Sequence, residues 1–337
     1  MAACVPQGRV FNRDLGYLIP EKDIENTISN IGISERRIAD DNVCASDLCC
    51  KADLRLMEDN GIDPSGIDVL LFMSQTGDYR IPATAPLLQH RLGLPKTTCC
   101  LDLSQGCAGY VYALSTAFAY ASMEGVNRVL LLDGETFSKI VNRRDKVDWP
   151  LYGDAGTATL IEKGDFEDSV FILDSDGSGE GAVKIPGGGM RNRTTAASLE
   201  ETEREEGNVR NDLEVYMDGM EVFNFAMGVV PKSIREIASV TGTSLEEIDW
   251  LVFHQANRFM TDFFAKRLKF DMEKVPYCIG RFGNTSSASI PLTIVSELED
   301  RLRDGDRMVM CGFGAGLSWG TARIVYRGCA ISPLIEY

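Results

Sequence analysis

The sequence has few of the features that mark nucleic-acid-binding or membrane proteins. Lysine and arginine total 34 against 50 aspartate and glutamate residues, which gives a formal net charge of −16. Binding to a phosphate backbone needs a dominant basic surface, so we expect no nucleic-acid partner. No apolar stretch reaches the roughly 20 residues of a membrane span, and no basic segment followed by an apolar run opens the chain. We therefore expect a cytoplasmic protein without a membrane span.

Histidines and paired cysteine motifs are also scarce. Ten cysteines are spread along the chain, but no C-x-x-C pair occurs, so neither a zinc ribbon nor a thioredoxin-type site is indicated. We expect no bound metal, and most of the cysteines should be small buried residues in a reducing compartment. His90 and His254 are the two histidines, which limits histidine chemistry to two positions.

The 337 residues contain an internal duplication. The apolar segment IDVLLF (67–72) resembles IDWLVF (248–253), and RVLLL (128–132) resembles RMVMC (307–311). Both pairs are about 180 residues apart, and two matches at one offset favour duplication over chance repetition of apolar strands. We therefore predict two pseudo-symmetric halves, residues 1–165 and 166–337.

Each half alternates short apolar runs with longer helical patterns. Helices are predicted at 109–123, 221–239, 257–269 and 290–303. Continuous apolar runs suit strands that are buried on both faces, and their alternation with helices indicates an α/β fold with helix-covered parallel sheets. Two stacked halves would give five layers. The glycine-rich and acidic stretch 186–212 is predicted to be a solvated loop or lid.

Cys107 is the candidate nucleophile. An apolar strand (LDL, 101–103) leads into the glycine turn that contains Cys107, and a helical pattern follows at once. The thiol should lie near a helix N-terminus, where the helix dipole and free N–H groups favour a thiolate. The local pattern is similar to a nucleophile elbow with cysteine in place of serine. The alternative is that Cys107 is one more buried core cysteine.

His254 and Asn284 are the candidate partners of Cys107. His254 directly follows an apolar strand, and the carboxyl ends of strands usually carry the functional groups of α/β proteins. His90, by contrast, lies in a helical pattern and reads as a surface residue. The duplication relates Cys107 to the glycine turn FGNTSSA (282–288), which contains Asn284 and also precedes a helix. Equivalent helix N-termini facing each other would bring Cys107 and Asn284 to one pocket.

The glycine-rich turn 312–316 (GFGAG) is not a dinucleotide-binding motif. The fingerprint G-x-G-x-x-G needs glycine at position 317, which is leucine, and the residues that follow read as a strand rather than a helix. The exposed N–H groups of such a turn could instead form part of an oxyanion hole.

Seven motifs, in this order, resemble those of the β-ketoacyl-acyl-carrier-protein synthase III group of the thiolase superfamily. They are GISERRIA (32–39), SQGCAGYVYAL (104–114), LYGDAGTATL (151–160), MDGMEVFNFA (217–226), HQAN (254–257), GNTSSASIPL (283–292) and GFGAGLSWG (312–320). The resemblance covers nearly the whole chain. It implies the thiolase-like five-layered fold of two pseudo-symmetric halves.

The resemblance also implies a reaction, a decarboxylating Claisen condensation. Cys107 would hold an acyl group taken from an acyl-CoA or acyl-carrier-protein primer. His254 and Asn284 would donate hydrogen bonds to the thioester oxygen of malonyl-acyl-carrier protein and stabilise the enolate left by loss of carbon dioxide. Backbone N–H groups of Cys107 and near Gly314 would form the oxyanion hole, with Gly219 close to the pocket. The reaction would need no metal or redox cofactor.

Partners follow from the same resemblance. It implies a homodimer with the strand near 97–100 at the interface and Ile81 of one chain near the other chain's acyl pocket. An acidic acyl carrier protein could dock on the basic residues after HQAN, which are Arg258, Lys266 and Lys269.

Three positions depart from the family pattern. Asn26 falls where a tryptophan often stacks on adenine, and Ser34 and Lys146 fall where arginines are common. These differences argue against simple acetyl-CoA priming, because lysine lacks the planar bidentate contact of arginine.

Two other functions compete with condensation. One is a thiolase-fold acyltransferase that forms an ester or amide without decarboxylation, but such relatives often lose the asparagine that Asn284 provides. The other is a non-enzymatic partner subunit or acyl-binding module, which usually lacks the nucleophile.

Overall fold

Among residues 1–167 and 169–337, which the computed structural model describes, six strands form the larger sheet. Their order is β16-β1-β7-β6-β4-β5. The bounds are β1 Ala2–Val5, β4 Val69–Met73, β5 Cys99–Leu103, β6 Arg128–Glu135, β7 Ala155–Glu162 and β16 Ile335–Glu336. All five residues of β4 are buried, as the continuous apolar run predicts for a strand covered on both faces.

The second sheet repeats the arrangement of the first. Its order is β13-β14-β15-β8, with bounds β8 Val170–Ser175, β13 Trp250–Phe253, β14 Arg307–Gly314 and β15 Ser318–Val325. In each sheet one parallel pair (β4 with β6, β13 with β14) is followed by an antiparallel neighbour (β7, β15). These parallel pairs are the segments that the internal duplication relates to each other in the sequence. The two pseudo-symmetric halves are therefore confirmed.

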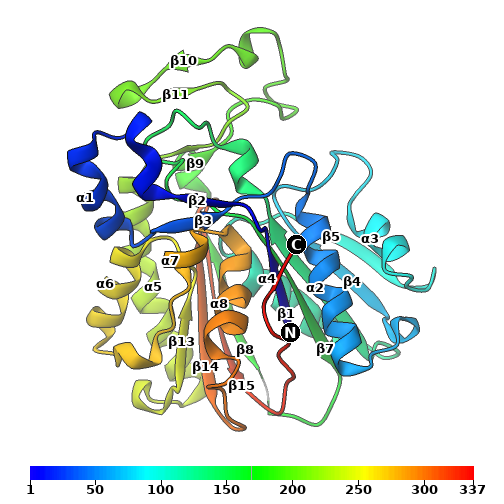
Figure 1. The fold of residues 1–337 in the computed structure, drawn as a ribbon. Coiled ribbons are helices and arrows are strands. Elements are labelled where there is room, and N and C mark those ends of the chain that lie inside the picture. The colour runs from blue at the N-terminus through cyan, green and yellow to red at the C-terminus, as the bar shows by residue number, and fades with distance from the viewer. Residues whose placement is uncertain (168) are drawn as a thin grey trace.

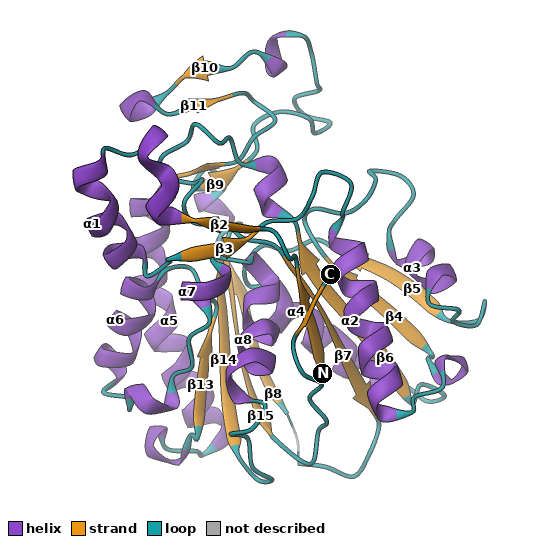
Figure 2. Ribbon diagram, in the orientation of Figure 1, coloured by secondary structure: helices purple, strands orange, loops and turns teal. Residues whose placement is uncertain are grey.

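Helices form three layers around the two sheets (Figures 1 and 2). The central layer holds α4 (Gly109–Ala121) and α8 (Ser289–Leu298), which contact strands of both sheets. The outer layers hold α2 (Ala45–Asn60) and α3 (Ala85–Arg91) on the first sheet, and α5 (Gly219–Thr241) and α6 (Arg258–Leu268) on the second. The five-layered α/β fold is therefore confirmed.

Three of the four predicted helices match observed helices to within two residues at each end. The fourth, predicted at 290–303, ends at Leu298 in the structure. Leu298 accepts hydrogen bonds from the backbone N–H groups of both Arg301 and Leu302. The helix therefore closes in a turn, and the polar residues that follow do not extend its apolar face.

Smaller elements cover the end of the molecule to which the carboxyl ends of the parallel strands point. They are α1 (Glu21–Ile31), α7 (Ile279–Phe282), the pair β2 (Arg9–Phe11) with β3 (Glu35–Arg37), the pair β9 (Val183–Lys184) with β12 (Tyr216–Met217), and the pair β10 (Thr202–Glu203) with β11 (Val209–Arg210). Figure 1 shows β10 and β11 projecting above this end.

The segment 186–212, predicted as a solvated loop or lid, is mostly exposed but is fastened to the body. Arg210 pairs with Asp145 at 2.6 Å, and both side chains are buried. Asn208 accepts a hydrogen bond from the backbone N–H of Lys146, and Glu201 pairs with Arg144. These contacts hold the outer end of the segment against residues 144–146.

The chain passes from one sheet to the other between β7 and β8. Strand β7 ends at Glu162 and β8 begins at Val170, while the C-terminal β16 returns to pair with β1. Because the chain passes from the first sheet to the second between β7 and β8, we propose the boundary between the halves at residue 165. None of the helices in the described part of the chain is long and apolar enough to cross a membrane.

Candidate active site

Cys107 lies in the turn between β5 and α4. The backbone N–H of Gly109 donates to the carbonyl of Gly106 at 2.6 Å, which closes this turn directly before the helix. Cys107 therefore sits two residues before α4, as the strand–turn–helix pattern predicts. The unpaired N–H groups of the first helical turn are close by in the chain.

Glycines let the second half approach Cys107 closely. A Cβ atom built on Gly314, the last residue of β14, would lie 2.9 Å from the Cβ and 3.1 Å from the Sγ of Cys107. One built on Gly312 would lie 2.9 Å from the carbonyl oxygen of Cys107. Any larger residue at either position would push against the nucleophile or its turn. Gly314 thus lies directly against the thiol.

His254 follows β13 and is almost fully buried. Its backbone N–H donates to the carbonyl of Cys311 at 2.8 Å, which extends the pairing of β13 with β14 by one residue. Its ring Nδ1 lies 2.7 Å from the Oγ of Ser289, and the ring meets Phe313 edge to face. Burial lowers the pKa of His254 to about 3, against a weaker effect of a hydrogen bond with the Ser286 backbone. His254 is therefore a neutral imidazole at neutral pH.

Asn284 follows Gly283, whose φ of +73° is accessible mainly to glycine. The backbone of Asn284 is held on both sides, because its N–H donates to Leu151 and its carbonyl accepts from Gly153. The side-chain Oδ1 accepts the backbone N–H of Ser286 at 2.9 Å. This contact identifies the oxygen of the amide, so the side-chain NH₂ is the donor left for a ligand.

The segment 284–289 connects all three candidate residues. Ser286 donates its backbone N–H to the Oδ1 of Asn284 and places its own Oγ 3.6 Å from the Sγ of Cys107. Ser289 bonds the ring of His254. Among the described residues no direct hydrogen bond joins Cys107, His254 and Asn284 to one another, so this segment is what organises them.

Ser286 adopts an uncommon backbone conformation. Its φ is +52°, in the left-handed region that non-glycine residues rarely occupy. Such strain of about 1–3 kcal/mol persists only where the surroundings impose it, and it is concentrated at functional sites. Here the Asn284 side chain, the Cys107 thiol and the ring of His254 all contact Ser286.

Ser287 is the residue that the duplication pairs with Cys107. Its hydroxyl donates to the Oδ1 of Asp133 at 2.6 Å, and Asp133 is fully buried at the end of β6. Burial raises the pKa of Asp133 well above its usual range. The position equivalent to the nucleophile thus serves as an anchor that ties the turn of Asn284 to the first sheet.

Sequence reasoning identified neither Ser286 nor Ser289 nor the Asp133 anchor. The duplication pointed to the turn 282–288, but the sequence N-T-S-S-A-S offers three similar serines. Which of them faces the thiol depends on the left-handed conformation of Ser286, and no residue type signals that conformation here.

Burial raises the pKa of the Cys107 thiol to about 11, while contacts with the Ser286 hydroxyl and with backbone N–H act in the opposite direction. This differs from the expectation of a thiolate at a helix N-terminus. The enclosure of the thiol outweighs the groups that favour its ionised form. The resting nucleophile is therefore mainly the thiol, and its proton has to leave during attack on a thioester.

The remaining predicted site residues lie further out. Gly219 opens α5, and a Cβ built on it would meet nothing within 4 Å. Ile81 is 89% exposed on the loop before α3. Glu135 anchors the start of that loop by accepting hydrogen bonds from Gln75 and Thr76.

The basic residues of α6 are divided between its two ends. Arg258 lies in the first turn, where its Nε bonds Asp262 at 2.8 Å and its guanidinium stacks 3.6 Å from the ring centroid of Tyr277. Lys266 lies in the last turn, about 12 Å further along the axis, and Lys269 caps the helix. Both lysines are exposed. Only Arg258 is close in the chain to His254, and its charge is already paired.

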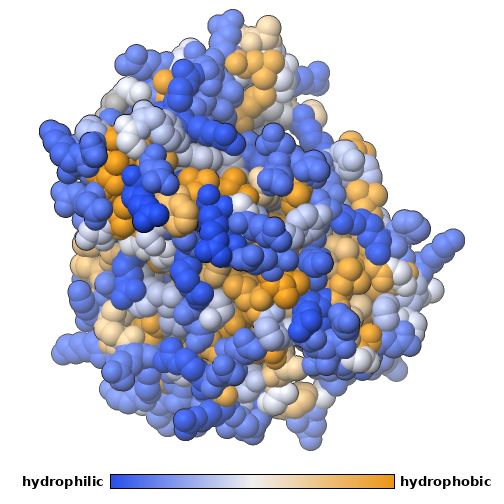
Figure 3. All heavy atoms as spheres, in the orientation of Figure 1, coloured by the Kyte–Doolittle hydropathy of each residue, from blue (hydrophilic) through white to orange (hydrophobic). Residues whose placement is uncertain are grey.

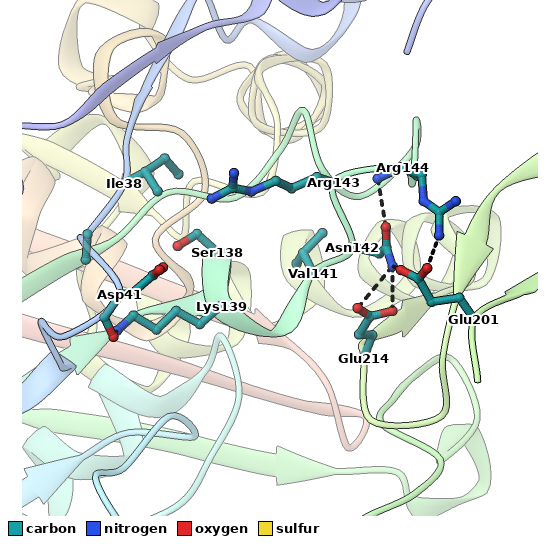
Figure 4. A pocket seen from close by; sticks show the side chains of 11 residues that line it. Ile38, Asp41, Ser138, Lys139, Val141, Asn142, Arg143, Arg144, Glu201 and Glu214 are labelled. Atoms are coloured by element: carbon teal, nitrogen blue, oxygen red, sulfur yellow. Dashed lines mark hydrogen bonds and ion pairs between the residues drawn. The ribbon is translucent and has the colours of Figure 1, made fainter. Parts of the chain in front are cut away.

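Figure 4 shows a surface pocket of about 470 Å³ between residues 38–41 and 138–144. Neither Cys107 nor His254 nor Asn284 lines it. Its polar groups bond one another, with Asn142 donating to Glu201 and Glu214. We assign no chemistry to this pocket.

Comparison with known proteins gives one consistent result. Residues 101–181 match the family model described as 3-oxoacyl-[acyl-carrier-protein (ACP)] synthase III, and residues 239–326 match the model of its C-terminal part. The chain is 35% identical over 322 residues to a β-ketoacyl-[acyl-carrier-protein] synthase III of Desulfitobacterium hafniense, with 94% of each chain covered.

Solved structures agree with this result. The crystal structure of a 3-oxoacyl-(acyl-carrier protein) synthase from Burkholderia xenovorans LB400 has a TM-score of 0.93 and 37% identity, covering 99% of this chain and 95% of the other. A priming β-ketosynthase from the R1128 polyketide biosynthetic pathway has a TM-score of 0.82 and 26% identity, covering 97% and 94% of the two chains.

Proposed function

The chain belongs to the 3-oxoacyl-[acyl-carrier-protein] synthase III family, and from this premise we propose that Cys107, His254 and Asn284 catalyse its reaction. The reaction is the decarboxylating condensation of an acyl thioester primer with malonyl-acyl-carrier protein. Its product is a β-ketoacyl thioester, the first unit of a growing acyl chain. The observation that carries the assignment of residues is the segment 284–289, which contacts or contains all three groups.

In the first half-reaction the sulfur of Cys107 attacks the carbonyl carbon of the primer. The carbon–sulfur bond to the carrier breaks, and the proton of the Cys107 thiol goes to the departing carrier thiol. Backbone N–H groups of Cys107 and of the turn near Gly314 stabilise the oxyanion of this step. The close approach of Gly314 to the thiol supports this placement, because the acyl carbonyl must lie within reach of both.

In the second half-reaction malonyl thioester loses carbon dioxide, and the electron pair of the broken carbon–carbon bond becomes an enolate. The neutral ring of His254 and the side-chain NH₂ of Asn284 donate hydrogen bonds to its oxygen. The enolate carbon then attacks the acyl-Cys107 carbonyl, and the Cys107 sulfur leaves as a thiolate, which takes up a proton from solvent to restore the resting thiol. A neutral His254 suits the role of donor, since it does not need to lose a charge in the buried site.

Plain acyl transfer to an alcohol or amine is the less favoured candidate. That reaction requires no stabilised enolate, whereas Asn284 is held here with its NH₂ group as the available donor. We further propose that Gly219 borders the pocket. No redox cofactor is proposed, because neither thioester exchange nor loss of carbon dioxide needs an external oxidant or reductant, and no metal is proposed, because His254 and Asn284 take the role of stabilising the enolate.

We propose an acyl carrier protein as the partner that delivers substrate, with CoA or a carrier protein bearing the primer. Lys266 and Lys269 are exposed and can attract an acidic carrier, while Arg258 already pairs with Asp262. We therefore assign the lysines to the outer docking contacts and Arg258 to the entrance beside His254. A cytoplasmic location stays a prediction from the sequence.

The test separates the two half-reactions. His254→Ala and Asn284→Ala should each lower malonyl decarboxylation by roughly 10²–10³-fold, the cost of one lost oxyanion donor. Acylation of Cys107, followed by intact mass, should change much less. His90→Ala, on the exposed surface of α3, is the matched control and should leave both half-reactions unchanged. An equal loss in both half-reactions would contradict the proposed roles.

A further inference from the structure

Ser289 is a fully buried hydroxyl at the first residue of α8. Its Oγ has two partners in the described structure. One is the Nδ1 of His254 at 2.7 Å, and the other is the backbone N–H of Gln255 at 3.2 Å. Its relation to Gln255 is fixed, because a backbone N–H can only donate.

The hydroxyl proton of Ser289 must find an acceptor, since a buried donor without one costs about 1–3 kcal/mol. If Nδ1 of His254 carried the ring proton, Ser289 would accept from both partners and its own proton would be left without an acceptor among the described contacts. If Nδ1 is the acceptor instead, Ser289 donates to His254 and accepts from Gln255. Only this second arrangement satisfies all three groups.

A neutral imidazole has one ring proton, so an accepting Nδ1 leaves the proton on Nε2. The pKa of about 3 keeps His254 in this neutral form. Phe313 meets the ring edge to face and restricts its rotation. The ring is thus held in one orientation by Phe313, by the Ser289 hydroxyl at Nδ1 and by a hydrogen bond with the Ser286 backbone.

We propose that Ser289 is a positioning residue that fixes His254 as the Nε2–H tautomer, so that Nε2 is the donor to the substrate thioester oxygen. The catalytic role of Ser289 rests on the proposed condensation, whereas the tautomer of His254 does not depend on it. It also excludes His254 as the base that deprotonates Cys107 in the resting enzyme, because Nδ1 is occupied and Nε2 already carries a proton. The groups that act on His254 are then the Ser289 hydroxyl at Nδ1, the backbone of Ser286 and, when substrate is bound, the thioester oxygen at Nε2.

The scarcity of histidine makes the tautomer measurable. In protein labelled with ¹⁵N-histidine, correlation of ring protons with ring nitrogens should show two ring systems, and His90→Gln should remove the one that belongs to exposed His90. At pH 7 we expect His254 to be neutral, with the proton on Nε2 and a hydrogen-bonded Nδ1. In Ser289→Ala the Nδ1 signal should move toward that of an unbonded ring nitrogen. A proton on Nδ1 in the wild type, or an unchanged Nδ1 signal in Ser289→Ala, would overturn the proposal.

The kinetics of Ser289→Ala test the positioning role of Ser289 independently of the tautomer measurement. We expect kcat for malonyl decarboxylation to fall roughly 10- to 100-fold, by analogy with the groups that orient metal-bound histidines through their second ring nitrogen. KM for the malonyl substrate and the rate of Cys107 acylation should stay within about threefold. Equal losses in acylation and decarboxylation would contradict a positioning role. Absence of acyl-Cys107 in the wild type would instead contradict the proposed function, and would leave the tautomer result intact.

Discussion

At the scale of single residues, the thiol of Cys107 is governed by two opposed effects. Enclosure raises its pKa to about 11, and the Ser286 hydroxyl at 3.6 Å acts against this rise. A neutral hydroxyl can stabilise a nearby thiolate by about 0.5–1.5 kcal/mol. Ser286 is therefore expected to set how readily the nucleophile ionises.

Removal of this hydroxyl should slow alkylation of Cys107. Ser286→Gly and Ser286→Ala should both lower the rate of modification by iodoacetamide at pH 8 by about 3- to 10-fold, measured on the Cys107 peptide by mass spectrometry. The two variants separate the hydroxyl from the backbone, because glycine accepts the φ of +52° and alanine does not. Unchanged alkylation in Ser286→Gly would show that the hydroxyl does not act on the thiol.

The sequence shows which residue types follow the predicted strands. It does not show which backbone conformations those residues and their neighbours adopt. The sequence predicts Cys107 and His254 as site residues because each follows an apolar strand, and Asn284 because the duplication relates its turn to that of Cys107. The contacts of Ser286 and Ser289 depend on a left-handed residue and on the rotation of α8. The ionisation state of Cys107 could not be predicted from the sequence either. Its position at a helix N-terminus predicts a thiolate, but how far the thiol is enclosed depends on the tertiary structure.

At the scale of elements, the buried face of α2 contains a carboxyl group without a hydrogen-bond partner among the described residues. The Asp53 side chain is fully buried, and neither carboxyl oxygen has a hydrogen-bond partner among the described residues. Burial raises the pKa of Asp53 to about 7. An acid that is harder to ionise in the folded state loses folding free energy as pH rises from its unfolded pKa near 4 to its folded pKa near 7.

Asp53→Asn should therefore flatten the pH dependence of stability. Relative to the wild type, its free energy of unfolding should rise with pH between about 4 and 7 and level off above, with a total change of up to about 4 kcal/mol. Urea unfolding at several pH values measures this difference. Glu58→Gln, at an exposed carboxyl of the same helix, is the control for general charge effects. A difference from the wild type that does not change with pH would show that Asp53 does not titrate in this range.

The periodicity and length of the apolar runs predict which segments are strands and which are helices. They predict the residues at which these elements end less well. The apolar runs at 69–73 and 250–253 became strands because both sheets are covered on both faces. The helix predicted to reach 303 stops at 298, where polar residues give no apolar face to continue. The short strands within 186–212 have no apolar pattern and are held by pairs such as Arg210 with Asp145, which no local pattern reveals.

At the scale of the whole molecule, the edge of the first sheet is open. Strand β5 pairs only with β4 among the described strands, and its Cys99 and Leu101 are exposed. An exposed edge of this kind is a ready template for another strand. The face in Figure 3 is mostly hydrophilic with separate apolar patches. The exposed Leu101 of β5 and the exposed Ile81 are apolar groups that a subunit interface would cover.

We therefore predict a homodimer formed through β5, with Ile81 close to the partner's acyl pocket. Light scattering should give twice the mass of the 37.1 kDa chain. Leu101→Glu should shift the mass toward the monomer, because it buries a charge at the interface. Leu173→Glu is the matched control, since Leu173 has a similar exposure on β8, the edge strand of the second sheet. A fully active monomer would contradict this assembly.

The whole proposed reaction depends on Cys107 carrying the acyl group. The most direct measurement is the intact mass of the protein after exposure to a panel of acyl-CoA and acyl-carrier-protein donors. The wild type and Cys329→Ser, which changes an exposed cysteine away from the predicted interface, should gain the mass of one acyl group, while Cys107→Ala should gain none and Cys107→Ser should gain it far more slowly. Acylation of Cys107→Ala, or a wild type that no donor modifies, would contradict the central claim.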